Sequence, residues 1–272
     1  MHNQPSPSVV HLNRYYHFTE LMRDPKIEGQ LLRYRSNYDG AVQTEFILRP
    51  AGSEPAKLFF FFHGMDGDSG DVVVVRNLVK ELNAEVVCMG GRGPAWVSDP
   101  FLADAEQVIR SHSGGFQNFY LIGISMGGTQ VLALPGLLPE DLRRAIAGVI
   151  AIIPGVNLPA IASGSSNDRV RNTLANSVNG DLSVLERRTP TRLIAEYEPG
   201  LSFVIFHNQA DTLLLSGELP GFISDLRSKG HRVTTFSAPG DHNFTYENFD
   251  YEEAIGRLGT DANEDEPPLI RS

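Results

Sequence analysis

Short apolar runs alternate along the chain with segments whose apolar residues recur at helical spacing. Residues 57–62 and 146–153 are short, mostly apolar runs without polar alternation, which is typical of strands buried on both faces of a parallel sheet. Further strands are predicted at 83–90, 118–124, 201–206 and 232–237, and helices at 72–82, 100–110, 221–229 and from Met126 onward. Such repeated strand and helix units predict an α/β fold with a mainly parallel sheet and helices on both of its faces.

Two segments depart from this repeat. Between Glu28 and Pro50, two strand patterns are separated by the turn signal at 37–40, which predicts a β-hairpin. Residues 155–200 have a weaker pattern and include the small, polar sequence ASGSSND. Because a strand-free segment of this length inside a compact domain usually carries a function, we expect a helical insertion or lid there.

Composition limits the class of protein. The 272 residues with 41% hydrophobic content suffice for one sizeable core, so a single domain is expected. The formal charge of −10 argues against a nucleic-acid or anionic-membrane partner, because both need clustered Lys and Arg to meet phosphates. Cys88 is the only cysteine, which excludes an intramolecular disulfide and a cysteine-based metal site. Without a secretory pattern or a run of about 18 apolar residues, a soluble cytoplasmic protein is expected.

The clearest chemical signal is Ser125, the centre of a G-x-S-x-G motif between a predicted strand and a predicted helix. Glycines two residues to either side leave room for a sharp, strained turn, so the serine side chain is exposed. The helix that begins at Met126 directs its free N–H groups toward the site, which suits an oxyanion. We therefore expect Ser125 to be a nucleophile rather than a helix cap.

A serine nucleophile needs a base, which a third group must orient. Among the eight histidines, His242 lies in a Gly/Pro loop after the last predicted strand, at the sheet edge where ligands bind. His207 also follows a strand, but Asp211 in the same loop is a natural orienting acid. We assign His242 as the base and Asp211 as the acid; Asp241 is a weaker acid candidate, because adjacent side chains rarely face each other. His112, at the end of a predicted surface helix, is expected to be solvated.

The order serine, acid, histidine, with the nucleophile on G-x-S-x-G, resembles the α/β-hydrolase superfamily. The resemblance implies a three-layer sandwich: an eight-stranded, mostly parallel sheet with a helical cap inserted after the sixth strand, where residues 155–200 fall. It implies an α/β-hydrolase domain over 28–258, preceded by an N-terminal extension at 1–27. The acidic, Pro-containing segment 259–272 is expected to be a disordered tail.

The same resemblance points to an oxyanion hole with two backbone donors. One donor is the N–H of Met126, directly after the nucleophile, and the other comes from the loop after the third strand. His63, Gly64 and Met65 occupy that loop and resemble an HG-x oxyanion motif, so Met65 is the expected second donor and His63 a possible pocket residue.

The acidic, glycine-rich sequence 66–71 raises the alternative of a metal site. Counted from Asp66 as an EF-hand loop, Gly70 takes the place of a ligand, Asp71 the place of the invariant glycine, and Asn77 the place of the final glutamate. Because none of these three positions carries the residue that an EF-hand loop requires, no metal is expected. Instead, Asp71 is expected to cap the helix over 72–82, as Asp99 is expected to cap the helix that begins at Pro100.

Arg92 and Trp96 follow the fourth predicted strand and are possible pocket residues. For Arg92, the alternatives are a binder of carboxylate or phosphate and a solvated or ion-paired residue. For Trp96, packing of its loop against the core is favoured over stacking on a substrate.

These residues together predict a serine hydrolase, without a cofactor, that cleaves a carboxylic ester or thioester through an acyl-enzyme. Its expected partner is a small-molecule or carrier-bound acyl substrate. One alternative is an acyltransferase whose lid excludes water so that an alcohol or amine accepts the acyl group. A non-catalytic binding module is another, because a fold alone does not fix function, and a peptidase or lyase is a third.

Overall fold

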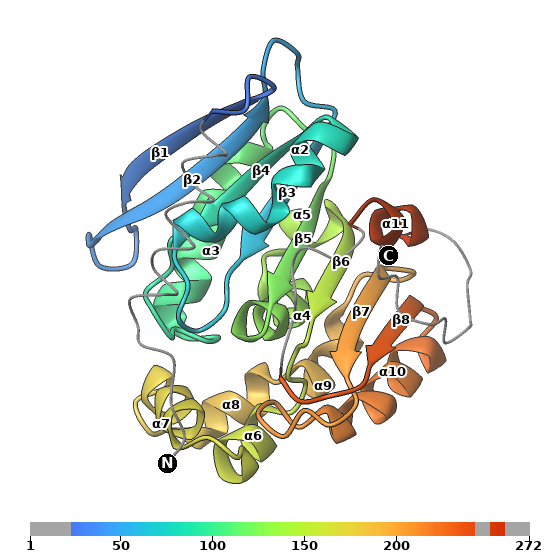
Figure 1. Cartoon of the computed structure of the whole chain (residues 1–272). Helices are drawn as coiled ribbons and strands as arrows, with labels where there is room; N and C mark the ends of the chain where they lie inside the picture. The colour runs from blue at the N-terminus through green and yellow to red at the C-terminus, as the bar shows by residue number, and fades with distance from the viewer. Residues whose placement is uncertain (1–22, 243–250, 259–272) are drawn as a thin grey trace, which may run out of the picture.

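The computed structural model describes residues 23–242 and 251–258, which form one eight-stranded sheet between two layers of helices (Figure 1). Most of the predicted N-terminal extension and the predicted tail lie outside these residues. The order of the strands is β1-β2-β4-β3-β5-β6-β7-β8; β2 is antiparallel to β1 and β4, and the other neighbours are parallel. The strands are β1 (Ile27–Arg35), β2 (Val42–Pro50), β3 (Lys57–Phe62), β4 (Ala84–Met89), β5 (Phe119–Ile124), β6 (Ile146–Ile152), β7 (Ser202–Asn208) and β8 (Arg232–Ala238).

Helices join the strands and fill the segment between β6 and β7. In the part of the chain that the structure describes, none of them is long and apolar enough to cross a membrane. The α-helices are α2 (Arg76–Leu82), α3 (Asp99–Ser113), α4 (Met126–Leu137), α5 (Glu140–Arg144), α6 (Leu158–Gly164), α7 (Asp168–Ser177), α8 (Leu182–Arg188), α9 (Pro190–Leu193), α10 (Leu219–Ser228) and α11 (Tyr251–Arg257). The 3-10 helices are η1 (Ser69–Val75), η2 (Ile194–Glu196) and η3 (Ser216–Glu218).

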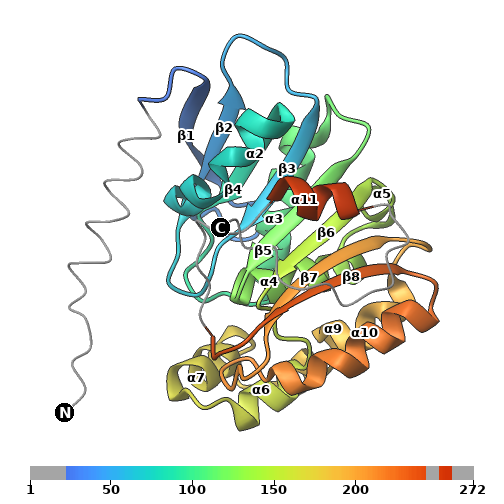
Figure 2. The ribbon, with the colours of Figure 1, turned by 45° about the vertical axis from the view of Figure 1, so that its right-hand side comes forward.

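Different helices cover the two faces of the sheet (Figures 1 and 2). On one face, α3, α4 and α10 pack on a core that includes Phe60 and Leu121. On the other face, η1, α2 and α11 pack on a core that includes Phe59 and Ile122. Successive residues of one strand therefore enter opposite cores, which explains why the central strands are apolar without alternation.

The helical insertion, α6 to α9, follows β6, the sixth strand of the chain. Figures 1 and 2 both show α6 and α7 beyond the carboxyl ends of the parallel strands, the edge at which ligands bind in open α/β sheets. The predicted three-layer α/β architecture, with a mostly parallel eight-stranded sheet and an insertion after the sixth strand, is confirmed.

Two predicted helix caps are wrong. Ser98, not Asp99, caps α3, because its hydroxyl accepts the backbone N–H three residues later at 3.4 Å. Asp68, not Asp71, caps the helical segment after β3, because its carboxylate accepts the N–H two residues later at 2.7 Å. This segment begins as the 3-10 helix η1 and becomes α-helical only at Arg76. Both helical segments therefore begin earlier than their apolar periodicity indicates.

The prediction that His112 is solvated is also wrong. Its ring lies between Glu45 of β2 and Glu85 of β4, with nitrogen–oxygen distances of 3.1 and 3.6 Å, and the three side chains are 6 to 10% exposed. Arg49 Nε lies 2.5 Å from the other oxygen of Glu85. Burial disfavours the imidazolium, but the bonds to the two carboxylates outweigh it and raise the pKa of His112 to about 9. The end of α3 is thus attached to the sheet by buried charges.

Candidate active site

Ser125 lies at the turn between β5 and α4. Its backbone has φ 57° and ψ −116°, a conformation that is strained for a residue with a side chain. Its amide N–H donates to the carbonyl oxygen of Ile152 in β6 at 2.9 Å, which attaches the turn to the sheet. The serine side chain does not cap α4, so its hydroxyl is available to other groups.

The motif glycines allow three elements to approach closely at this turn. A Cβ on Gly123 would lie 2.1 Å from the carbonyl oxygen of Gly127. A Cβ on Gly127 would lie 2.0 Å from the carbonyl oxygen of Phe62 in β3. Both distances are far below van der Waals contact, so a larger residue at either position would separate α4 from the strands. The glycines thus have the steric role that the motif predicts.

Ser125, His242 and Asp211 form a chain of hydrogen bonds. Ser125 Oγ lies 2.9 Å from His242 Nε2, and His242 Nδ1 lies 2.7 Å from Asp211 Oδ2. The other carboxylate oxygen accepts the N–H groups of Leu213 and Leu214 at 2.9 and 3.0 Å. Because an ionised carboxylate only accepts, Nδ1 carries the proton in a neutral ring, and Nε2 accepts from the serine hydroxyl. This arrangement can remove a proton from Ser125.

Asp241 contacts the backbone of this site rather than the imidazole ring. Its Oδ1 accepts the N–H of His242 at 2.8 Å and the N–H of Thr212 at 3.2 Å, and these bonds lower the pKa of Asp241. Asn208 Nδ2 donates to the carbonyl oxygen of Asp241 at 2.5 Å. The loops after β7 and β8 are therefore joined, and it is His242, not His207, whose ring is bonded to the serine.

The loop after β3, residues 63–67, lies against the serine; we call it the β3 loop. A Cβ on Gly64 would lie 3.7 Å from the Cβ of Ser125. The buried ring of His63 has Nδ1 2.7 Å from the carbonyl oxygen of Gly64 and Nε2 3.1 Å from that of Gly90. His63 thus braces the β3 loop against the loop after β4.

The amide N–H groups of Met65 and Met126 remain available near the serine. Within the described residues, no hydrogen bond uses either of them. Met126 is the first residue of α4, whose first N–H groups have no partner inside the helix and carry the positive end of its dipole. Such donors suit the negative oxygen of a tetrahedral intermediate.

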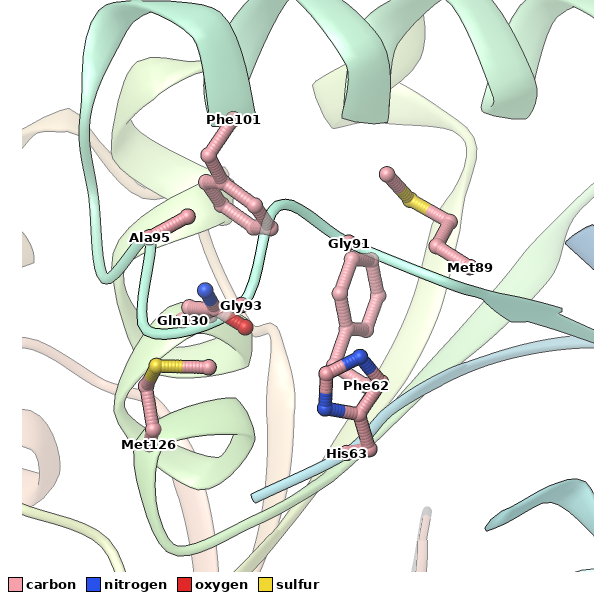
Figure 3. A pocket seen from close by; sticks show the side chains of 9 residues that line it. All are labelled: Phe62, His63, Met89, Gly91, Gly93, Ala95, Phe101, Met126 and Gln130. Atoms are coloured by element: carbon pink, nitrogen blue, oxygen red, sulfur yellow. The ribbon is translucent and has the colours of Figure 1, made fainter. Parts of the chain in front are cut away.

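A small cavity lies between His63, Met126 and the loop after β4. Its volume is about 10 Å³, room for about one water molecule. Figure 3 shows the ring of His63, the thioether of Met126 and the amide of Gln130 around this space. The residue after the serine, Met126, and the first residue of the β3 loop, His63, therefore line the same cavity.

Arg92 and Trp96, the two further pocket candidates, have partners in the protein. Arg92 binds Asp39 through both Nη atoms, at 2.7 and 2.9 Å, and Asp104 through Nε at 2.6 Å. Of the two alternatives for Arg92, the structure therefore contains the ion-paired one. These ion pairs connect the β1–β2 turn to α3. Trp96 is 1% exposed and packs in the core, and its Nε1–H donates to Thr173 of α7 at 3.2 Å.

The acids after β3 serve local structure. Asp66 pairs with Arg169 of α7, and Asp68 caps η1. In 23–242 and 251–258, no group of three or more His, Cys, Asp or Glu side chains is arranged to hold a metal ion.

Two polar residues near the site were not predicted from the sequence. Gln130 Nε2 donates to the carbonyl oxygen of Trp96 at 2.6 Å, and Thr173 Oγ1 lies 3.3 Å from Met65 Sδ. Gln130 had a usable signal, since it is a polar residue within a helix that is otherwise mostly apolar and buried. Thr173 had none, because it lies on an amphipathic helix whose partner the sequence does not indicate.

Solved structures of low sequence identity share the fold. FphF, the fluorophosphonate-binding serine hydrolase F of Staphylococcus aureus, is 16% identical over 86% of this chain and 99% of its own, with a TM-score of 0.67. An esterase of Pyrobaculum calidifontis is 15% identical over 94% of this chain and 91% of its own, with a TM-score of 0.69. The S-formylglutathione hydrolase FrmB of Staphylococcus aureus is 14% identical over 85% and 97%, with a TM-score of 0.64. No protein-family model and no curated protein matches the sequence. The chain has the α/β-hydrolase fold.

Proposed function

We propose that the protein is a serine hydrolase that cleaves a carboxylic ester or a thioester through a covalent acyl-enzyme. The observation that carries the proposal is the pair of hydrogen bonds from Ser125 to His242 and from His242 to Asp211, at 2.9 and 2.7 Å. Structures of the same fold that are named as an esterase and as an S-formylglutathione hydrolase support acyl groups on oxygen or on sulfur.

In the first step, Ser125 Oγ attacks the acyl carbonyl carbon while His242 Nε2 takes the hydroxyl proton. The new C–O bond forms as the carbonyl π electrons move onto the oxygen. Collapse of this tetrahedral intermediate breaks the bond to the leaving oxygen or sulfur, which takes the proton from His242. Asp211 stays ionised and stabilises the imidazolium.

In the second step, water hydrolyses the acyl-enzyme. His242 Nε2 takes one proton from the water as its oxygen attacks the acyl carbon, and a second tetrahedral intermediate forms. The bond to Ser125 Oγ then breaks, and Oγ recovers a proton from His242. The products are the free acid and the original serine.

Backbone donors would stabilise both intermediates. The N–H groups of Met65 and Met126, which have no hydrogen-bond partner within the described residues, are proposed to bind the oxyanion. The substrate is proposed to be a small-molecule or carrier-bound acyl compound, and the insertion of α6 to α9 to act as a lid over the site. The position of α6 and α7 at the carboxyl ends of the strands supports that role (Figure 2).

Labelling with a fluorophosphonate probe tests the proposal. We expect the wild type to be labelled and Ser125→Ala not to be, and we expect p-nitrophenyl esters or acyl thioesters to be cleaved only by the wild type. Circular dichroism of the variant controls for folding. Equal labelling of both proteins, or a folded wild type that neither reacts nor hydrolyses, would overturn the proposal. Added alcohols or amines in the same assay distinguish hydrolysis from acyl transfer through the products formed.

A further inference from the structure

The helix α7 holds two consecutive residues of the β3 loop. Arg169 and Thr173 are four residues apart, so their side chains lie on one face of α7. Arg169 pairs with Asp66, with Nη1 3.2 Å from Oδ2. Thr173 Oγ1 lies 3.3 Å from Met65 Sδ. One face of a helix from the insertion thus fixes the part of the loop that follows Gly64.

Thr173 also reaches the other side of the site. Its Oγ1 accepts the Nε1–H of Trp96 at 3.2 Å. The carbonyl oxygen of Trp96 accepts the Nε2–H of Gln130 at 2.6 Å, and Gln130 lies on α4, the helix that starts after Ser125. Trp96 has φ 45° although it is large and 1% exposed, so its surroundings must hold it in a strained conformation. Thr173 therefore contacts the β3 loop and the loop after β4, and through Trp96 it is connected to α4.

The hydroxyl of Thr173 can serve both contacts at once. A threonine hydroxyl has one proton and two lone pairs, so it accepts from Trp96 and donates to one acceptor. The acceptors in reach are Met65 Sδ at 3.3 Å and the carbonyl oxygen of Val170 at 3.2 Å. Because a thioether is a weak acceptor, the contact between Thr173 and Met65 adds little to the stability of the protein. Its contribution is to orient the side chain of Met65.

We propose that Arg169 and Thr173 are positioning residues for the oxyanion hole, so that the helical insertion helps to assemble the catalytic site. The inference rests on the proposed function, in which the Met65 N–H binds the oxyanion. The side chains of Met65 and Asp66 contact α7, and the preceding residue, Gly64, adjoins Ser125, since a Cβ on Gly64 would lie 3.7 Å from the Cβ of Ser125. A shift of α7 would therefore move a donor whose placement decides how well it stabilises the transition state.

Thr173→Val tests this role, because valine keeps the shape of threonine and removes the hydroxyl. With p-nitrophenyl acetate we expect kcat to fall roughly 10-fold, less than the ~10²–10³-fold loss for removal of a whole oxyanion donor. KM should stay within about two-fold, because only the transition state carries the oxyanion. Affinity for a trifluoromethyl ketone, whose adduct with the serine is an oxyanion, should fall by the same factor as kcat/KM.

Two matched variants control this test. Ser177→Ala removes another hydroxyl from α7, which donates only within the helix, to Leu174 O at 2.7 Å, and should leave kcat unchanged. Thr173→Ser keeps the hydroxyl and should recover most of the lost kcat. Arg169→Gln should lower kcat with the same pattern as Thr173→Val, because it releases Asp66.

A double-mutant cycle separates the two contacts of Thr173. Met65→Leu removes the sulfur acceptor and keeps the approximate volume, so its effect on kcat should not add to that of Thr173→Val. Additive losses, an unchanged kcat in Thr173→Val, or an equal loss in Ser177→Ala would each overturn the inference alone. A wild type without hydrolysis and without fluorophosphonate labelling would instead overturn the proposed function, and this inference with it.

Discussion

Among single residues, two aspartates close to His242 are expected to differ in their effect on catalysis. Asp211 accepts from the imidazole ring, whereas Asp241 accepts from backbone N–H groups. We expect Asp211→Asn to lower kcat by ~10³–10⁴-fold, because an amide group at this position favours the wrong tautomer of the ring. Asp241→Asn should lower kcat much less, by roughly 10-fold or below, because it weakens only the hydrogen bonds to the backbone of the loop.

Steady-state kinetics with p-nitrophenyl acetate checks this ranking. Circular dichroism shows whether each variant is folded. A larger loss in Asp241→Asn than in Asp211→Asn would contradict the assignment of the acid.

That Ser125, Asp211 and His242 lie together was predictable, because their signals are local. Ser125 has its motif, and Asp211 and His242 each lie in a loop directly after a strand, so the parallel sheet brings them to one edge. The choice between Asp211 and Asp241 followed from local geometry as well. Thr173 was not predictable, because its role depends on where α7 packs, and no local pattern specifies that packing.

Among the elements, the turn from β5 to α4 makes a specific steric demand. A methyl group at Gly127 would lie 2.0 Å from a carbonyl oxygen of β3, which cannot move without breaking the sheet. We expect Gly127→Ala to destabilise the protein by about 2 to 4 kcal/mol, as overpacking in a closed core does, and to abolish activity.

Gly221 provides the matched control, because it lies inside α10 with nothing within 4 Å of an added Cβ. We expect Gly221→Ala to stabilise the protein by about 0.5 to 1 kcal/mol without a change in kcat. Urea unfolding measures both variants. A similar midpoint for Gly127→Ala and the wild type would contradict the steric argument.

Element boundaries were less predictable than element types. The central strands are apolar at almost every position, so their places follow from the sequence within one or two residues. Helix starts depend on a single side-chain bond, and Ser98 and Asp99 are adjacent residues that can both cap. The segment after β3 has four consecutive valines, and β-branched residues lower the helix propensity. They also do not mark where a helix starts, and the segment begins as a 3-10 helix.

At the scale of the whole molecule, a buried charge cluster joins α3 to the sheet. The sequence could not indicate it, because Glu45 and Glu85 lie on different strands, and His112 has the spacing of a surface position. Only the packing of α3 over β2 and β4 brings the ring between the two carboxylates.

This cluster predicts a dependence of stability on pH. The pKa of His112 is raised from 6.5 to about 9 in the folded protein, so its stabilising effect is complete below about pH 6.5 and is lost as the pH rises through about 9. We expect the free energy of unfolding to fall by about 1 to 3 kcal/mol between pH 7 and pH 10 from this group, at about 1.4 kcal/mol for each pKa unit.

Urea unfolding at several pH values measures this fall. His112→Gln cannot titrate, so its unfolding free energy should fall less over the same range, although it starts lower because Glu45 and Glu85 lose a cation. Parallel curves for the wild type and the variant would contradict the prediction.

The chain order of the elements also means that the residues proposed for catalysis belong to two separable lengths of polypeptide. Ser125 and the β3 loop precede the helical insertion, and Asp211 and His242 follow it. The two lengths meet along the β6–β7 ladder, which pairs Val149 with Phe203 through to Ile152 with Phe206. Between α7 and α8, Gly180 is exposed, has φ 78° and has nothing within 4 Å of an added Cβ.

Covalent continuity at Gly180 should therefore be dispensable. If a protease site is inserted after Gly180 and cut in the folded protein, the two pieces should stay together by strand pairing and shared core and keep most of their hydrolytic activity. Gel filtration and activity before and after cleavage test this. Neither piece of the cut protein carries all three of Ser125, Asp211 and His242. In urea, which favours separation of the pieces, the activity of the cut protein should therefore fall as the protein is diluted, whereas the activity per molecule of the uncut protein should not.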